Sequence, residues 1–303
     1  MTTTGPAPTE PTPAKNRNPG SFEELHRKAQ EVFPMCFEGA KVMVNKGLSS
    51  HFQVSHTVSI SQQATGYKFG ATYVGTQKIS DNEAFPILLG DTDAQGNTSA
   101  TIIHQFGKRW RTKLLTQVQK GQIAGAQANL ERRGDMYTMG IQLVNTDIIH
   151  DSGIFVANYL RRITESLDVG LEYMNVYGNN VPGGGISNIT YAARMTRPWW
   201  TGALSLSAHT INASYFHKQT PNIAFGVEFN CNRLHGDAVT TFAYQAELPE
   251  EGMTFRASCD TNWTVGGVVE KKLSQYLPFT LAISGLLNHA KSVGKFGVGI
   301  IIG

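Results

Sequence analysis

The stretch HFQVSHTVSIS, His51 to Ser61, decides how this chain folds. Between Phe52 and Ile60 apolar side chains occupy every second position except one, which is His56, and Gln, Ser and Thr fill the positions between them. Successive side chains of an extended strand point to opposite faces of a sheet. The stretch therefore predicts a β-strand with one apolar face and one polar face that carries no formal charge.

The same two-residue period recurs from about Gly39 to the end of the chain. Clear examples are residues 67–73, 124–131, 167–173, 223–230 and 279–288. Turn residues such as those at 132–135 and 178–185 separate these stretches, mostly at intervals of roughly 10 to 15 residues. About 265 residues of this pattern, at about 10 per strand plus a short turn, predict roughly 18 to 20 strands.

The composition of the polar faces indicates how so many strands are arranged. Open sheets seldom reach this size, so the chain either splits into stacked sandwiches or closes into a barrel. Charged residues make up only 16% of the sequence, whereas the exposed faces of soluble sandwiches carry many Lys and Glu. A water-filled lumen tolerates Ser, Thr, Gln and Asn, so the pattern favours an all-β transmembrane barrel. A soluble all-β binding or scaffold protein is the alternative.

Several classes of function are disfavoured by the composition. The formal net charge of +3, without a basic block that contains aromatic residues, argues against nucleic-acid binding. Cys36, Cys231 and Cys259 are odd in number and widely spaced, with no C-x-x-C motif, so the sequence indicates neither a disulfide framework nor a zinc site. His51 and His56 have no metal-ligand partner at a suitable spacing. We predict neither an enzyme nor a resident metal or cofactor.

The N-terminal segment differs from the rest of the chain. Residues 1–20 are rich in Pro and Thr, and we predict a disordered tail. Ser21 and Glu24 form a capping-box pattern and Pro34 ends the segment, which predicts one short amphipathic helix. Its apolar face contains Phe22, Leu25, Val32 and Phe33. The pattern alone favours a helix packed on the outside of a core.

Longer motifs resemble a known family. VNKGLSSHFQVSHT (Val44–Thr57), NPGSFEELHRKAQEVFP (Asn18–Pro34) and FPILLGD (Phe85–Asp91) are similar to the channel-forming subunit of the mitochondrial outer-membrane translocase, the TOM complex, within the eukaryotic porin superfamily. The resemblance extends from about Asn18 to Gly303. It implies a 19-stranded barrel, with an N-terminal helix inside the pore and the C-terminus facing the intermembrane space. An odd strand number requires the first and last strands to pair in parallel, whereas the others are antiparallel.

This resemblance divides the chain into a tail, a pore segment and a barrel, at residues 1–20, 21–38 and 39–303. It implies a protein-conducting channel for unfolded precursor proteins in the mitochondrial outer membrane. A metabolite pore like the voltage-dependent anion channel is the alternative. The implied partners are precursors with presequences, the central and peripheral receptors, small single-helix subunits, membrane lipid, the sorting and assembly machinery, and further barrels in an oligomer.

Strand parity predicts which acidic residues face the lumen. They are Glu131, Asp168, Glu172, Glu228 and Asp260. Mitochondrial presequences are amphipathic and rich in Arg, so these carboxylates are candidates for weak, reversible contacts with a moving chain. The alternative is that they pair with lumenal bases and only neutralise the interior. The bases considered are Lys68, Lys113, Arg194 and Arg256.

Two residues on the predicted lipid face are candidates for a subunit interface. Lys46 follows three outward apolar residues in the first strand, and Trp200 precedes a similar series later in the chain. In similar family members, the matching positions contact the membrane helix of the central receptor. The simpler interpretation is a Lys side chain that extends to the membrane surface and a Trp of the interfacial belt.

The chain ends with KFGVGIIIG, Lys295 to Gly303. Such an apolar run at a terminus needs a pairing partner, and a closed barrel supplies one on each side. The run also matches the assembly signal of mitochondrial barrel proteins, polar-x-Gly-x-x-hydrophobic-x-hydrophobic. The matching residues are Lys295, Gly297, Ile300 and Ile302. The resemblance therefore implies that this strand is both the closing strand and the signal read by the assembly machinery.

Overall fold

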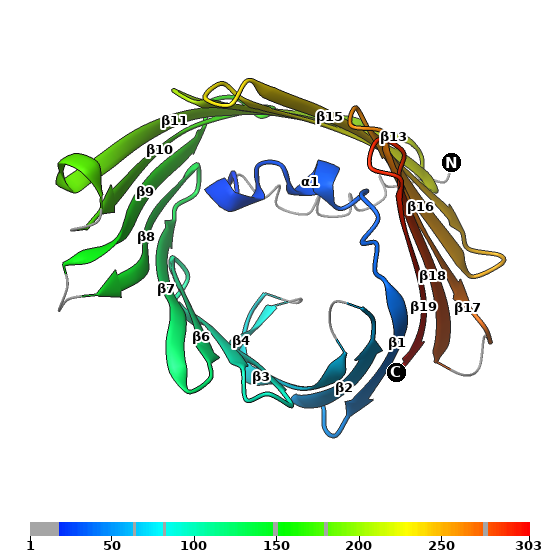
Figure 1. Cartoon of the computed structure of the whole chain (residues 1–303). Coiled ribbons are helices and arrows are strands. Elements are labelled where there is room, and N and C mark those ends of the chain that lie inside the picture. Colours follow the sequence, from blue (N-terminus) through cyan, green and yellow to red (C-terminus); the bar gives the residue numbers. More distant parts are fainter. Residues whose placement is uncertain (1–17, 63–64, 81–82, 148–150, 179–180, 275–277) are drawn as a thin grey trace, which may run out of the picture.

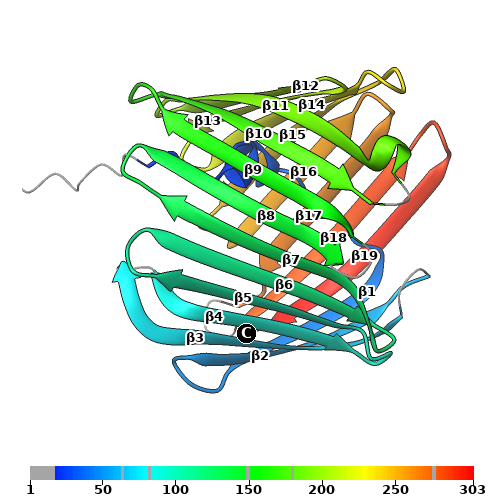
Figure 2. The ribbon, with the colours of Figure 1, turned by 90° about the vertical axis from the view of Figure 1, so that its left-hand side faces the viewer.

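A computed structural model of the chain shows nineteen strands in one closed sheet around a lumen (Figure 1). The structure describes residues 18–62, 65–80, 83–147, 151–178, 181–274 and 278–303. The strands are tilted relative to the barrel axis (Figure 2), as ring closure requires. The predicted fold class and the count of 19 strands are confirmed.

The first ten strands are β1 (Gly39–Gly47), β2 (Phe52–Ile60), β3 (Gly66–Ser80), β4 (Glu83–Asp93), β5 (Thr98–Phe106), β6 (Trp110–Gln119), β7 (Gln122–Arg133), β8 (Tyr137–Asp147), β9 (Ser152–Arg162) and β10 (Leu167–Tyr177). The remaining strands are β11 (Gly185–Thr196), β12 (Trp200–Ser207), β13 (Thr210–Thr220), β14 (Ile223–Asn232), β15 (Asp237–Leu248), β16 (Met253–Asp260), β17 (Thr264–Lys272), β18 (Phe279–Asn288) and β19 (Val293–Ile302). The described helices are the 3-10 turns η1 (Phe22–Glu24) and η2 (Pro182–Gly184) and the α-helix α1 (Arg27–Gln30).

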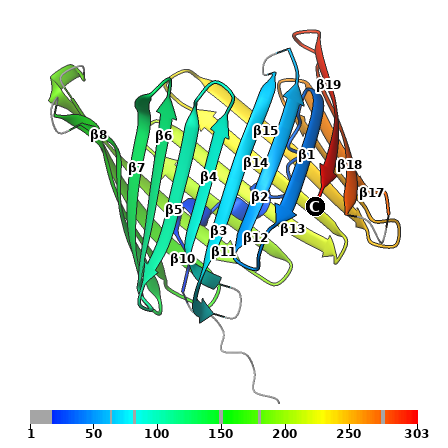
Figure 3. The same ribbon diagram turned by 90° about the horizontal axis from the view of Figure 1, so that it is seen from below.

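The barrel closes through β1 and β19, which lie side by side and run parallel (Figure 3). Val42 of β1 lies opposite Ile300 of β19, and Gly39 lies opposite Gly297. All other neighbouring strands pair antiparallel and follow each other in sequence. The odd strand count explains the exception, because strand 19 must run in the same direction as strand 1. Both ladder edges of the C-terminal strand are therefore paired.

One end of the barrel is defined by the end of β19 and is called the C-terminal rim below. Because neighbouring strands alternate in direction, odd-numbered strands finish at this rim and even-numbered strands begin there. The turns that follow β7 and β9 and the start of β12 consequently lie at the C-terminal rim. This assignment fixes the height of the residues discussed below.

The outer face of the barrel is apolar. Leu130, Ile141 and Leu171 are 41%, 49% and 41% exposed, and such a continuous apolar surface requires a lipid environment. Aromatic rings contact each other across strands on this face. The ring centroids of Tyr137 and Tyr159 are 6.2 Å apart, those of Trp200 and Tyr215 are 5.9 Å apart, and those of Phe225 and Tyr244 are 5.3 Å apart. Several begin or end strands at the C-terminal rim, as expected of an interfacial belt.

The N-terminal segment lies inside the barrel (Figure 1), and its helix is shorter than predicted. Instead of one helix up to Pro34, the chain forms η1 and then the four-residue α1. The break falls at His26, whose ring binds two serines of the wall. So short a helix is held by packing rather than by propensity. In the described part of the chain, no helix has the length and apolarity needed to span a membrane.

The boundary of the predicted tail also requires correction. The composition predicts a disordered tail up to residue 20, but Asn18 and Pro19 make hydrogen bonds to the barrel wall. Gly20 donates its N–H to the Asn18 side chain at 2.8 Å. The rest of the predicted tail, residues 1–17, lies outside the described residues.

Candidate functional site: the lumen and its N-terminal segment

The apolar face of the N-terminal segment packs on the barrel wall. Leu25 and Val32 are each 2% exposed, and Leu25 forms a buried cluster with Leu160 of β9 and Ala192 of β11. Burial of an aliphatic side chain of this size contributes about 1.5–3 kcal/mol relative to leaving it exposed. Phe22 packs against the edge of this cluster. Hydrophobic burial thus holds the segment against one side of the lumen and leaves the other side open.

Small wall residues make this close approach possible. A Cβ atom at Gly226 of β14 would lie 2.9 Å from the Ala29 carbonyl oxygen and 3.5 Å from the Phe33 ring. A Cβ atom at Gly170 of β10 would lie 3.2 Å from the Phe22 ring. Real Cβ atoms essentially never show the first of these distances, and the last is tighter than most Cβ contacts, so glycine at both positions lets the segment dock without displacement. The lumen wall is therefore shaped to fit its own N-terminal segment.

His26 contributes a polar anchor to the same surface. Its Nδ1 lies 2.7 Å from Ser214 Oγ and its Nε2 lies 2.8 Å from Ser205 Oγ. Each hydroxyl donates or accepts as the imidazole tautomer requires. Burial lowers the pKa of His26 below its usual 6.5. The charge of Arg194 acts in the same direction, and Glu228 opposes it. The docked segment therefore favours the neutral imidazole.

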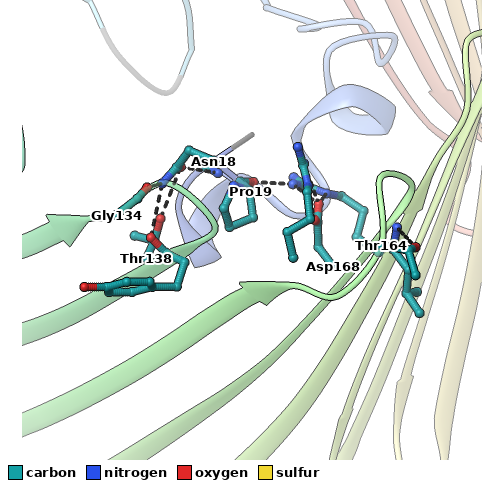
Figure 4. A network of polar contacts seen from close by, with 11 residues as sticks. Asn18, Pro19, Gly134, Thr138, Thr164 and Asp168 are labelled. Atoms are coloured by element: carbon teal, nitrogen blue, oxygen red, sulfur yellow. Dashed lines mark hydrogen bonds and ion pairs between the residues drawn. The ribbon is translucent and has the colours of Figure 1, made fainter. Parts of the chain in front are cut away.

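The N-terminal end of the segment is held by a network at the C-terminal rim (Figure 4). Asp168 of β10 has no exposed surface and accepts from Arg162 Nε at 2.7 Å and from Arg194 Nη2 at 2.7 Å. Arg194 also donates to the Pro19 carbonyl oxygen. A single carboxylate thus positions two arginines, one of which binds the backbone of the N-terminal segment.

Asn18 supplies the second half of this network. Its side-chain amide donates to the Gly134 carbonyl oxygen at 2.6 Å and to the Tyr137 carbonyl oxygen at 3.2 Å. The Thr138 hydroxyl donates to Asn18 Oδ1 at 3.2 Å. Gly134 belongs to the turn between β7 and β8, so Asn18 is fixed at the C-terminal rim (Figure 4).

The five acidic residues predicted to face the lumen have different environments. Asp168 is enclosed by its two arginines, so it is not available to a passing chain in this conformation. Glu131 pairs with Arg133 at 3.2 Å. Asp260 accepts from the Thr264 backbone N–H at 2.7 Å and closes the turn between β16 and β17.

Glu172 and Glu228 are half-buried, as are Glu131 and Asp260, but within the described residues neither accepts a hydrogen bond from an arginine side chain or a backbone N–H. Glu228 accepts from Gln30 of α1 at 3.5 Å. For Asp168, the structure contains the alternative arrangement, in which the carboxylate pairs with lumenal bases. One of these bases is Arg194. Glu172 and Glu228 are therefore the two acidic residues of the predicted set that have neither an arginine nor a backbone N–H partner among the described residues.

Crevices remain on both sides of the N-terminal segment. One, of about 370 Å³, lies between α1 and the wall from β13 to β16. It contains Lys28, Lys218 and Arg256 together with Glu31 and Glu247. The other, of about 120 Å³, lies between η1 and the wall from β5 to β7. Both are lined by mixed charges, which suits weak contacts with a moving polar chain rather than tight binding of one ligand.

Lys46 and Trp200 lie on the outer face, as strand parity predicted. Lys46 is exposed near the end of β1, and Trp200 begins β12 and packs against Tyr215. Both lie at the C-terminal rim. Their positions are compatible with an interfacial Lys and Trp and also with a subunit interface. Among the described residues, no three His, Cys, Asp or Glu side chains are grouped so as to hold a metal ion.

Sequence reasoning missed the anchors of the N-terminal segment. Asn18 and Pro19 carry no helical or strand pattern, and His26 sits on the edge of the apolar face. Their partners are up to 188 residues away in the sequence. The one available signal was the presence of inward glycines such as Gly170 and Gly226 in otherwise regular strands, which marks a close backbone approach.

The closed 19-stranded barrel with a lumenal N-terminal segment defines a class of membrane pore. The profile of the eukaryotic porin family matches residues 18–299, and the chain belongs to this family. A mutant of the Rh. blastica porin has a related fold, with a TM-score of 0.50 at 12% identity, over 78% of this chain and 97% of that one.

Within this family, the chain is similar to curated relatives over almost its whole length. It is 62% identical to the mitochondrial import receptor subunit TOM40 homolog of Caenorhabditis elegans, over 96% of this chain and 97% of that protein. It is 42% identical to TOM40 homolog 2 of Drosophila melanogaster, over 94% and 84% of the two chains. The identity to the Homo sapiens TOM40 homolog is also 42%, over 94% and 78%.

Neutralising Asp168 should release the N-terminal segment. Removal of one partner of a buried ion pair costs about 3–5 kcal/mol, and Asp168→Asn removes the carboxylate on which two arginines converge. We expect a spin label introduced by Glu23→Cys, in a chain whose native cysteines are replaced by serine, to become mobile. Glu172→Gln, on the same face of β10, is the matched control and should leave the label immobile. An equally immobile label in Asp168→Asn would contradict the proposed anchor.

Docking of the segment should weaken as the pH falls. The docked His26 has a lowered pKa, so the undocked segment binds a proton more readily. The contribution of docking is complete above the ordinary pKa of 6.5 and is lost as the pH falls below it. The same label should become more mobile between about pH 7.5 and about pH 5.5. His26→Gln should abolish this dependence, and an unchanged pH profile in that variant would argue against the role of His26.

Proposed function

We propose that this chain is the protein-conducting channel of a mitochondrial outer-membrane translocase, through which unfolded precursor proteins pass. The supporting observation is its similarity, over nearly the full length, to relatives named as mitochondrial import receptor subunits. The barrel supplies what such a function needs, namely a lipid-compatible outer face and a polar lumen. Transport through it requires no covalent chemistry.

The lumen favours weak contacts with a positively charged chain. Glu172 and Glu228 lie on the inner face of β10 and β14 and are half-buried, so water screens their charge only in part. A presequence rich in Arg would be attracted to each of them and released again. Asp168 is not among these contacts, because its charge is compensated by Arg162 and Arg194. Its role in this proposal is to hold the N-terminal segment against the wall.

A metabolite pore remains the second candidate, because the family fold also suits small solutes. The names of the relatives favour protein import. The two functions differ in what they predict for the lumenal carboxylates. A protein channel should be sensitive to them when its cargo carries an Arg-rich presequence, whereas a metabolite pore should respond mainly through ion selectivity.

We further propose that the channel works within the TOM complex. Lys46 and Trp200 lie on the outer face at the C-terminal rim and are candidate contacts for the membrane helix of a central receptor. The peripheral receptors, the small single-helix subunits, the sorting and assembly machinery and an oligomer of barrels are further proposed partners. None of these contacts needs the lumen, so they leave the transport path free.

Charge reversal in the lumen should slow import. We expect Glu172→Lys combined with Glu228→Lys to reduce the import rate of presequence-bearing precursors several-fold, because the new cations repel the Arg-rich segment. The matched control is Glu250→Lys combined with Glu251→Lys, which changes the net charge equally at the exposed turn between β15 and β16. The measurement is import of a radiolabelled precursor into mitochondria that contain each variant. Equal import rates for both variants would contradict the proposed contacts.

The C-terminal strand is also proposed as the assembly signal, and its test needs care. Gly297 cannot be changed without affecting the finished barrel, because an added Cβ atom would collide with Phe37. Ile300 is a better site, since it points outward and is 37% exposed. Val298 points outward on the same strand, is 38% exposed and does not belong to the signal pattern.

Ile300→Gln should therefore block barrel assembly, whereas Val298→Gln should not. Both changes place one polar side chain on the same lipid-facing surface, so their effects on membrane stability should be similar. The measurement is the yield of assembled complex by native electrophoresis after synthesis. If both variants assemble equally well or fail equally, the signal assignment is wrong.

A further inference from the structure

The linker between the lumenal helix and the first strand turns back under the closing strand. Gly39 begins β1 with φ of +82°, a left-handed conformation that favours glycine. A Cβ atom at this position would collide with the Ile60 carbonyl oxygen of β2. The residues just before Gly39 consequently lie against the inner faces of β17, β18 and β19, directly behind the β1–β19 closure.

Four contacts fix this linker. The Phe37 backbone N–H donates to Ser284 Oγ of β18 at 2.9 Å, and Ser284 has no exposed surface. Cys36 Sγ lies 3.6 Å from the Gly285 carbonyl oxygen. Glu38 pairs with Lys295 of β19 at 3.2 Å. The fourth contact is that of the Phe37 ring, which packs on β19 itself.

The inner face of β19 is hollowed where the ring sits. A Cβ atom at Gly297 would lie 2.8 Å from ring carbon Cδ2 of Phe37, and one at Gly299 would lie 3.1 Å from Cζ. Both values are shorter than ordinary van der Waals contact, so any side chain at these positions would displace the ring. Gly297 is also the residue of β19 that lies opposite Gly39. The hollow formed by Gly297 and Gly299, called the cradle below, is therefore located at the first residue pair of the parallel closure.

We propose that the linker Cys36–Glu38 staples the β1–β19 closure from inside the barrel, with the Phe37 ring seated in a cradle formed by Gly297 and Gly299. The parallel ladder is the weakest type of strand pairing in this sheet, and here the ring adds packing contacts to β19 from the lumen side. The ion pair between Glu38 and Lys295 spans the same boundary. The two inward glycines of the last strand thus have a role in the finished barrel, whatever cargo the barrel conducts.

Hydrogen exchange of the full-length chain in lipid nanodiscs, read by mass spectrometry, tests this proposal. In Phe37→Ala, amides of β1 and β19 should exchange at least about tenfold faster than in the wild type, because the substitution removes ring packing that stabilises the β1–β19 pairing. Amides of β8 and β9 should be unchanged. Phe33→Ala is the matched control, since it removes the same side chain from the same segment but at the wall formed by β14.

A second variant changes the β19 side of the same contact instead of the ring. Gly299→Ala should loosen β1 and β19 as Phe37→Ala does, because the atom nearest to its added Cβ atom is Cζ of the Phe37 ring, at 3.1 Å. The two changes together should cost less than the sum of their separate effects, because both remove one interaction. The proposal is overturned if Phe37→Ala leaves β1 and β19 protected, or if Phe33→Ala loosens them as much. It is also overturned if exchange rises equally in β8 and β9, which would indicate a general loss of stability rather than a local staple.

Discussion

The parallel pairing of β1 with β19 is the constraint on which the rest of this structure depends. In a lipid bilayer an unpaired strand edge leaves backbone N–H and C=O groups without partners, at a cost of several kcal/mol for each group. With 19 strands the ring closes only if the first and last strands run in the same direction. This requirement fixes the position of both ends of the barrel sequence, and it places the start of β1 at the rim opposite to the end of β19.

The location of the N-terminal segment follows from this geometry. The chain that precedes β1 enters the lumen at the rim where β1 starts and is anchored by Asn18 at the C-terminal rim. Hydrophobic burial of Leu25 and Val32, the two hydrogen bonds of His26 and the Asp168 network act at successive points along that path. A lumen that contains its own polypeptide segment has one wall covered by it and another left for transport.

Much of the fold could be predicted from the sequence, because a two-residue period sustained over most of the chain has few structural solutions. The alternation in residues 52–60 and the charge-poor polar faces together indicate a barrel, whereas the count of 19 came from the family resemblance. The site was less predictable. The sequence analysis placed Asp168 on the inner face and Arg194 among the lumenal bases, but parity does not show that Arg194 and Arg162 lie opposite Asp168 on the two neighbouring strands and neutralise it.

The N-terminal helix shows the same limit. Its apolar face was visible in the 3.6-residue period, and Leu25 and Val32 are buried as that face requires. The predicted helix is longer than the observed one, because local propensity carries no information about the hydrogen bonds between His26 and the wall residues Ser205 and Ser214. The sequence indicates only an assembly-signal role for Gly297, since the contact of Gly297 with Phe37 joins residues that are far apart in the sequence.

The closed parallel seam is tested most directly by cysteine crosslinking in its own register, in a full-length chain whose three native cysteines are replaced by serine. Val42 and Ile300 are register partners on the outer face, and neighbouring strands are about 4.8 Å apart, which is within the reach of a disulfide. Val42→Cys with Ile300→Cys should crosslink in the membrane, whereas Val42→Cys with Val298→Cys, shifted by two residues, should not. Efficient crosslinking of the shifted pair, or none in the matched pair, would contradict the closure described here.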